Sequence, residues 1–201
     1  MGKLYQEVHN YVSDFGLDEI IVEIGSDRWE GSSAYFAQMA KDNNTKLYTC
    51  DLDVECESRL RRHIPIELHP YYEFYNENGT YFAAQMMSRL SKQYIKVLYL
   101  DNYDWDWNIE IENSMIAKQR TWYALQGIEM NNLDCQTQHL NQMLHLMPLM
   151  SRDAVVCLDD TYRHNGVFIG KGGAVVPYLL AIGYTILEEK DFGVILGRNQ
   201  N

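Results

Sequence analysis

The chain is short of basic residues. Its 17 Lys and Arg stand against 28 Asp and Glu, which gives a net charge of -11. Such a surface repels phosphate backbones, so we expect no nucleic-acid partner. Apolar runs as long as a membrane-spanning helix are also missing, and we expect no membrane insertion. The first stretch of the chain is mixed and polar, unlike a signal peptide.

Cysteine pairs at metal-binding spacing are absent as well. The four cysteines never form a Cys-x-x-Cys pair, which argues against a zinc site or a reactive dithiol. Cys50 and Cys157 end apolar runs, where cysteine serves as a small buried residue in a reducing compartment. We therefore expect a cytoplasmic protein.

What the sequence does contain is an alternation of apolar runs and helical patterns over 201 residues, without repeat or linker. This length suits one domain, 1–201. The runs predicted as strands are 20–25, 46–51, 64–69, 95–101, 154–160, 184–189 and 192–198. The helices predicted between them lie at 32–43, at 80–93 with Thr80 as N-cap, at 136–150 and at 172–183. Such alternation is typical of a parallel sheet covered on both faces, here ending in an antiparallel hairpin.

The stretch 102–135 fits this alternation least, because it is rich in Trp, Asn and acidic residues. It is predicted to be an insert after the fourth strand. Loops that leave the carboxyl ends of such strands line the ligand crevice, so the insert is a candidate lid or substrate wall. Trp105, Trp107 and Trp122 would then face a substrate. The alternatives are a rigid packed excursion and a homo-oligomer contact.

Small and acidic residues follow the first three predicted strands. Gly25 permits a tight turn after the first strand, and Gly31 and Ser33 stand at the start of the next helix. Asp51 ends the second strand, where a carboxylate can accept hydrogen bonds from both ribose hydroxyls. The stretch 76–80, N-E-N-G-T, follows the third strand and could meet an adenine edge. The plain alternative is an ordinary strand-to-helix turn and a solvated Asp51; a dinucleotide site would need G-x-G-x-x-G.

The motif E-I-G-x-x-x-x-x-G-x-S, followed by T-C-D, resembles the cofactor motif of class I S-adenosylmethionine-dependent methyltransferases. It is most similar to the catechol O-methyltransferase-like and cephalosporin-hydroxylase-like branches. The resemblance implies an α/β, Rossmann-like fold with a mostly parallel seven-stranded sheet, an antiparallel C-terminal hairpin and helices on both faces. It also implies S-adenosylmethionine as cofactor. The residues implied to border that cofactor are Glu23, Gly25, Ser26, Gly31, Ser33, Asp51, Thr80 and Asp101.

Acidic residues end the fourth and fifth predicted strands. Asp101 follows the fourth strand, and Asp159 and Asp160 follow the fifth. Adjacent parallel strands lie about 4.8 Å apart, so these carboxylates should converge, and their repulsion calls for a cation or protons. Oxygen ligands favour Mg²⁺, Mn²⁺ or Ca²⁺. The pattern is similar to the metal-dependent O-methyltransferases, which implies that these three are metal ligands. The alternative is that Asp101 bonds a helix N-terminus or a substrate, and that Asp159 and Asp160 cap the next turn.

The group that would take the acceptor's proton is open. The catechol-type enzymes carry a Lys three residues after the first Asp, and this chain has Asp104 there. Asp101, His139 and His164 are the remaining catalytic candidates. Lys171, in G-K-G-G, either binds an anionic substrate group or belongs to a flexible glycine turn.

These observations predict methyl transfer to a small-molecule acceptor, at oxygen and with help from a divalent cation. The alternatives are a metal-dependent hydroxylase-like enzyme of the same fold and a non-catalytic cofactor-binding protein.

Overall fold

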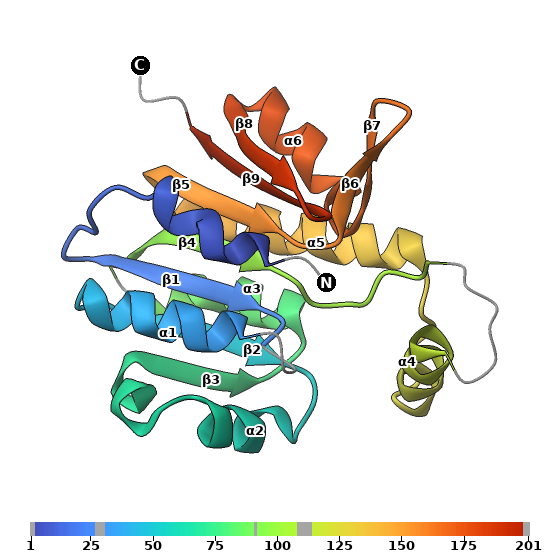
Figure 1. Ribbon diagram of the computed structural model, residues 1–201, viewed down its shortest axis with the longest axis horizontal. Coiled ribbons are helices and arrows are strands. Elements are labelled where there is room, and N and C mark those ends of the chain that lie inside the picture. The colour runs from blue at the N-terminus through green and yellow to red at the C-terminus, as the bar shows by residue number, and fades with distance from the viewer. Residues whose placement is uncertain (1–2, 27–30, 91, 108–113, 199–201) are drawn as a thin grey trace.

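A seven-stranded sheet forms the centre of the protein (Figure 1). The computed structural model describes residues 3–26, 31–90, 92–107 and 114–198. The strands of the sheet are β1 (Glu19–Ile24), β2 (Leu47–Asp51), β3 (Tyr72–Asn76), β4 (Tyr94–Leu100), β5 (Met150–Leu158), β8 (Tyr184–Lys190) and β9 (Gly193–Arg198). Their order is β3-β2-β1-β4-β5-β9-β8. The first five pair in parallel, and β9 is antiparallel to both β5 and β8. The predicted sheet and its C-terminal hairpin are confirmed.

Helices cover both faces of this sheet, so the central strands are apolar on both sides. One face packs against α3 (Gly79–Arg89), α5 (Asn132–Leu146) and α6 (Val175–Ala181). The other packs against the 3₁₀ helix η1 (Leu4–Asn10), α1 (Ser32–Asp42) and α2 (Cys56–His63). Within β1, every residue from Ile20 to Ile24 is buried. In the described part of the chain, no helix has the length and apolar character needed to cross a membrane.

The third strand lies later in the sequence than predicted. The stretch 64–69 is not a strand, because it leaves α2 and enters the 3₁₀ helix η2 (Ile66–Tyr71). Pro65 begins that turn, its carbonyl accepts from the Leu68 amide, and Pro70 lacks the amide that a ladder needs. The strand is Tyr72–Asn76 at the sheet edge, where half-exposed aromatic and polar residues hide the usual apolar signal.

Two helix boundaries also differ from the prediction. Asn78, not Thr80, caps α3: its side chain accepts hydrogen bonds from the amides of Thr80 and Tyr81 at 2.9 and 3.4 Å. Helix α5 begins at Asn132 and ends at Leu146, followed by the 3₁₀ helix η3 (Met147–Leu149), which contains a proline.

The region around the predicted insert holds structure of its own. Helix α4 (Met115–Leu125) lies within it, while residues 108–113 are outside the described residues. Figure 1 shows α4 beyond the arrowheads of the parallel strands, apart from the layered body. A two-stranded hairpin, β6 (Thr161–His164) with β7 (Val167–Gly170), follows β5 and was not predicted; the short 3₁₀ helix η4 (Lys171–Gly173) comes next.

Gly25 is required where β1 turns beside the end of β4. Its φ is +94°, and a Cβ there would lie 2.5 Å from the Asn102 nitrogen and 2.6 Å from the Asp101 carbonyl carbon. Because these neighbours are backbone atoms, they cannot rotate away. The sequence reasoning about this glycine is confirmed in its turn geometry.

We expect Gly25→Ala to lower the free energy of unfolding by about 2 kcal/mol or more, since backbone strain and overpacking add. Gly183→Ala is the matched control, because Gly183 has φ +93° and a Cβ there would meet no atom within 4 Å. Only the conformational strain, about 1 kcal/mol, remains there. Urea unfolding of the two variants measures the difference, and equal losses would contradict the close-approach argument.

Candidate active site at the carboxyl edge of the sheet

Glu23 joins three elements at the end of β1. Its buried carboxylate accepts hydrogen bonds from the hydroxyls of Ser32 (2.7 Å), Ser33 (2.6 Å) and Thr49 (2.7 Å). These bonds tie β1 to the first turn of α1 and to β2. Charge-assisted bonds of this length are stronger than neutral ones. Glu23 and Ser33, which the resemblance implies as cofactor residues, are therefore bonded to each other and hold the start of α1 against the end of β1.

Ser26 and Gly31 lie on either side of the undescribed part of the same turn. Ser26 is buried, and its hydroxyl is 2.7 Å from that of Thr49. Gly31 is the N-cap of α1 with φ +96°, a left-handed conformation suited to glycine. Residues 27–30 of the same loop are outside the described residues. The amino end of α1 therefore meets the carboxyl end of β1, an arrangement that favours anionic groups.

Asp51 lines a narrow pocket at this edge. The pocket has about 40 Å³ of space for water. Asp51 is buried and one of its carboxylate oxygens accepts from the Asp53 amide at 2.8 Å. The wall opposite comes from the insert, through Trp122 and Tyr123 of α4. The full lining is Cys50, Asp51, Leu52, Asn78, Gly79, Asn102, Tyr103, Trp122, Tyr123 and Ile128.

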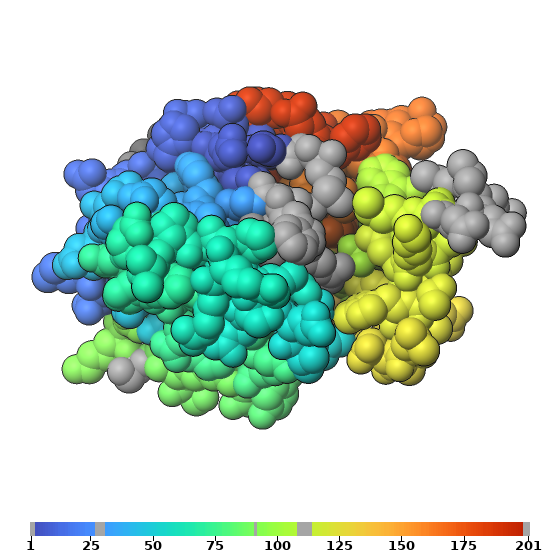
Figure 2. Space-filling model, turned by 60° about the horizontal axis from the view of Figure 1, so that its bottom comes forward, coloured from blue at the N-terminus to red at the C-terminus, as the bar shows by residue number. Residues whose placement is uncertain are grey.

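Figure 2 shows the segment of α4, in yellow, as a lobe facing the teal segment that carries α2 and β3. The insert and the end of β2 thus meet across the pocket. Thr80 does not line it: its hydroxyl donates to Gln138 of α5 instead. One buried atom of the pocket, Oδ1 of Asn102, has no hydrogen-bond partner among the described residues.

A larger cavity, about 370 Å³, lies elsewhere. Its walls include His9, Phe15 and Tyr35, and it extends to Asn43, at the carboxyl end of α1. The motif residues stand at the other end of that helix. The volume of a cavity alone therefore does not identify the candidate active site. The polar residues that converge at the carboxyl edge of the sheet do.

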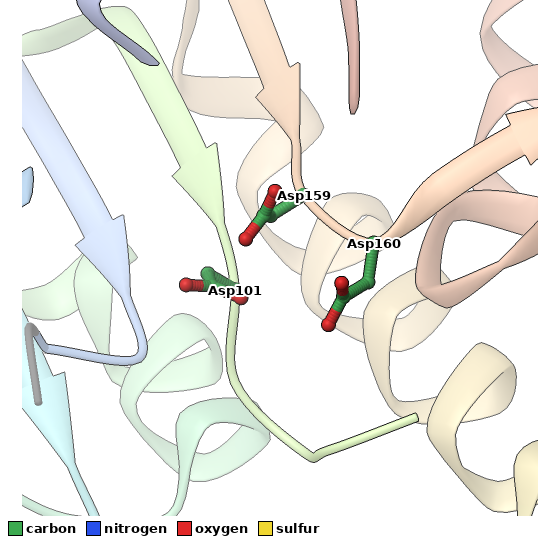
Figure 3. Close-up of side chains that lie close together, drawn as sticks. All are labelled: Asp101, Asp159 and Asp160. Carbon is green, nitrogen blue, oxygen red and sulfur yellow. The ribbon is translucent and has the colours of Figure 1, made fainter. Parts of the chain in front are cut away.

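The predicted convergence of acids is confirmed. Oxygens of Asp101, Asp159 and Asp160 all lie within 4.8 Å of one another. Figure 3 shows them at the ends of the neighbouring strands β4 and β5. Asp101 and Asp159 are held by the sheet itself, since the Asp101 amide donates to the Ile24 carbonyl (2.8 Å) and the Asp159 amide to that of Leu100 (3.3 Å).

Lys171 forms ion pairs with two of the three acids, Asp101 and Asp160. Its ammonium nitrogen is 2.5 Å from Oδ1 of Asp101, 3.1 Å from Oδ2 of Asp160 and 3.2 Å from the Asp101 carbonyl oxygen. The side chain is 3% exposed. The expectation of a flexible glycine turn is wrong, because the loop is packed tightly enough to bury a lysine.

Glycines on both sides bring Lys171 into place. A Cβ on Gly170 would lie 1.8 Å from the Asp160 carbonyl oxygen, and one on Gly172 would lie 2.6 Å from the Thr161 hydroxyl. The Lys171 amide donates to that same Asp160 carbonyl at 2.9 Å. Sequence reasoning placed Lys171 at a helix start and missed its partners. The signal was a lysine set among three glycines shortly after an Asp-Asp pair.

The charges of the cluster are strongly coupled. Burial by itself would lower the pKa of Lys171, but Asp101 and Asp160 together raise it well above its usual value, so the ammonium stays charged. Burial, and then the charge of Asp101, raise the pKa of Asp159 to about 8. Asp159 therefore holds a proton near neutral pH. This proton relieves the repulsion among the carboxylates that the single Lys171 ammonium does not offset.

The two histidine candidates lie in different surroundings. His139 is fully buried on α5, and its Nδ1 donates to the Cys135 carbonyl at 2.8 Å. Burial lowers its pKa to about 3, so the imidazole is neutral and a weak base at physiological pH. His164 is exposed at the end of β6, about 10 Å of extended chain beyond Thr161. The structure brings neither into hydrogen-bond contact with the carboxylates.

A cluster of aromatic side chains lies near the acids. The sequence analysis did not predict it. Trp107, from the insert, stacks on Tyr162 with ring centroids 5.5 Å apart and an interplanar angle of 9°. Phe192 meets both rings edge-on. The Phe192 carbonyl accepts from the amide of Thr161, directly after Asp160. Three segments distant in sequence thus form an apolar wall next to the acidic cluster.

Solved structures of other proteins share the fold of this chain. A putative rRNA methylase from Clostridium thermocellum aligns with 98% of the chain and 94% of its own, with a TM-score of 0.55 and 9% identity. The TDP-rhamnose 3'-O-methyltransferase CalS11 aligns with 98% and 78%, TM-score 0.60, 10% identity. A putative methyltransferase from Streptococcus mutans, in complex with S-adenosylhomocysteine, aligns with 98% of both chains, TM-score 0.53, 10% identity. The chain has the Rossmann-like methyltransferase fold. At these identities the similarity establishes the methyltransferase fold, and no more.

Sequence comparisons add no closer relative. No protein-family model matches the chain, and no curated protein matches it. The methyltransferase fold is therefore recognised through its strand order and not through a conserved signature.

We expect the buried His139 to make the protein sensitive to acid. The unfolded chain binds a proton on this group near pH 6.5, while the folded chain resists protonation until about pH 3. The stability that neutral His139 contributes is present above pH 6.5 and is lost as the pH falls, by up to about 1.4 kcal/mol per pH unit.

His139→Asn keeps the donor to the Cys135 carbonyl and removes the titration, so its unfolding free energy should fall less steeply between pH 6 and 4. His145→Asn, at an exposed position of the same helix, is the control and should keep the wild-type slope. Urea unfolding across pH measures both slopes. Parallel curves for the wild type and His139→Asn would contradict the assignment.

Proposed function

We propose that the chain is an S-adenosylmethionine-dependent methyltransferase that acts on a hydroxyl group of a small molecule. One observation carries the proposal: the pocket that contains Asp51 lies beside the Gly25 turn, on the same sheet edge as the acidic cluster. A cofactor in that pocket would have its reactive end directed along the edge. Solved structures of the same fold include a complex with S-adenosylhomocysteine.

The residues present suit this cofactor. Asp51 offers a carboxylate to ribose hydroxyls, and the amino end of α1 suits the amino-acid carboxylate. Asn102 lines the same pocket, and its buried Oδ1 has no hydrogen-bond partner among the described residues. When bound, the cofactor would supply the methyl group. The chain's own part is to orient donor and acceptor in line and to exclude water.

The pocket is too small for an adenosine while α4 stands where it does. Ligand pockets generally hold several hundred Å³, against about 40 Å³ here. Trp122 and Tyr123 narrow it, and both belong to the insert. We infer that α4 shifts to admit the cofactor and then covers it, which is the lid expected from the sequence.

The acceptor is proposed to be small and at least partly apolar. Two features support this: the wall of Trp107, Tyr162 and Phe192 beside the acids, and the net charge of -11. Some neighbours of the same fold are described as rRNA methylases and others as small-molecule O-methyltransferases. The acidic surface favours the second group, since it repels RNA. Within the cluster, Asp101 is the candidate to accept the hydroxyl proton, because Asp159 already holds a proton near neutral pH.

The predicted divalent cation fits the acids by geometry and conflicts with Lys171. One neighbour of this fold is described in complex with Mg and S-adenosylhomocysteine. Magnesium needs oxygens at about 2.0–2.1 Å in octahedral array. In this chain an ammonium already contacts two of the three carboxylates. The ion remains a prediction from the resemblance, and no step of the proposed reaction passes through it.

Asp51 tests cofactor binding. Asp51→Asn should weaken binding of S-adenosylhomocysteine about tenfold or more, because hydrogen bonds to a charged group contribute about 1.5–3 kcal/mol. Asp53→Asn is the matched control, since Asp53 pairs with Arg59 at 2.7 Å and does not line the pocket. Calorimetric titration measures both. Absence of binding by the wild type at millimolar concentration would exclude the proposed function. Binding without transfer of labelled methyl to any acceptor would favour a non-catalytic or hydroxylase-like protein.

The lid can be tested by hydrogen exchange. Amides of α4 should exchange rapidly in the free protein and slow down when S-adenosylhomocysteine binds, because the helix closes over the ligand. Helix α6, which packs beside the last strands of the chain, serves as internal control, and its exchange rates should not change. Slow exchange unaffected by ligand would indicate a rigid excursion. Protection that rises with protein concentration would instead indicate a homo-oligomer contact through the insert.

A further inference from the structure

We propose that Lys171 permanently takes the place of a divalent cation in the acidic cluster, so that this chain binds no metal there. The inference deepens the proposed function, because it concerns the same edge of the sheet. It rests on the arrangement of charges alone, and its test does not use turnover. Failure of this inference and failure of the proposed function therefore give different results.

The first support is where the ammonium lies. Its contacts, at 2.5 and 3.1 Å, are with Asp101 and Asp160, which are two of the three residues that could hold a metal. A divalent ion bound to the same oxygens would sit within a few ångströms of a buried positive charge. Repulsion between like charges is strong where water is excluded, so the ion and the ammonium exclude each other.

The second support is that Lys171 cannot simply turn away. Its side chain is 3% exposed, and its backbone amide is bonded to the Asp160 carbonyl. Gly170 and Gly172 allow the loop to pack on Asp160 and Thr161 with no room for a Cβ. The Gly172 amide also donates to the Thr161 hydroxyl at 2.8 Å. The loop thus delivers the lysine to the acids as part of the folded core.

The third support is the charge that the cluster would otherwise carry. Three carboxylates within 4.8 Å repel one another unless a cation or a proton is present. Lys171 is the cation that the chain itself provides. A chain that relied on a metal would gain nothing by placing a competing ammonium among the ligands. Lys171 is accordingly a positioning residue that holds Asp101 and Asp160 in place for the acceptor.

The test measures Mn²⁺ binding by the loss of its free electron paramagnetic resonance signal, on full-length, EDTA-treated protein. The wild type should take up no stoichiometric Mn²⁺ at millimolar concentration. Lys171→Ala should bind one Mn²⁺ at least tenfold more tightly than the wild type, because removal of the ammonium leaves oxygen ligands and space. Adding Asp159→Asn to that variant should abolish the gain.

Thermal unfolding provides the matched comparison. Lys171→Ala should melt at a lower temperature than the wild type, and Mn²⁺ at about 100 times its Kd should raise the melting temperature by about 5 °C or more. Lys96→Ala is the control. Lys96 is another buried lysine, 2% exposed, bonded to Asp153 (2.6 Å) and Glu19 (3.3 Å) at the amino ends of the strands. Its loss should destabilise the protein without rescue by Mn²⁺.

Stoichiometric Mn²⁺ binding by the wild type that Asp159→Asn removes would overturn the inference. So would a folded Lys171→Ala protein with no gain in Mn²⁺ affinity. If Lys171→Ala does not fold, Lys171→Met fills the same volume without the charge and takes its place. The titration of the wild type and of Asp159→Asn decides the question even if neither Lys171 variant folds, since Mn²⁺ binding that depends on Asp159 contradicts the inference and its absence supports it.

Discussion

The parallel pairing of β1 with β2 and β4, and of β4 with β5, is the constraint on which the rest of the site depends. Parallel strands all end at the same edge, and the hydrogen bonds between them fix how far each one reaches. Ile24 pairs with Cys50 and Leu100, and Leu100 pairs with Leu158. The residues after these four positions, Gly25, Asp51, Asp101 and Asp159, therefore stand in one row across the sheet.

That row places one carboxylate beside a pocket and buries others close together. Asp51 stands beside a pocket and can remain a charged acceptor for a ligand. Asp101 and Asp159 stand where β4 and β5 are covered by the loop after β7, and burial of several carboxylates together is costly. Lys171, which lies in the loop after β7 and outside the parallel sheet, offsets part of this cost by pairing with the carboxylates. The carboxyl edge is thus divided into a half that carries the pocket and a half where an ammonium offsets part of the negative charge.

The similarity to known methyltransferases establishes the fold of this chain but not the chemistry of its site. Identities of 9–10% over nearly the whole chain show that the architecture is shared, and a shared architecture does not fix the chemistry of a site. In this chain the individual features are the insert with α4, the aromatic wall around Trp107, and Lys171. All three lie on the carboxyl side of the sheet, where loops vary most freely without disturbing the core.

Much of the fold follows from the sequence because its signals are local. The apolar runs of β1, β4 and β5, the Gly25 turn, and the acids at strand ends each depend on neighbours within a few residues. The edge strand β3 was misplaced for the opposite reason: its half-exposed aromatic and polar residues lack the apolar pattern of a buried strand.

The sequence by itself indicated that three carboxylates converge at one edge, because they follow two runs that were predicted to be neighbouring parallel strands. Only the tertiary structure decided what neutralises them. Lys171 lies 70 residues from Asp101. No periodicity relates the two, because their contact depends on how the loop after β7 folds back onto Asp160 and Thr161. Long-range contacts of this kind depend on how elements pack against each other, and the residue pattern of a single segment does not predict that packing.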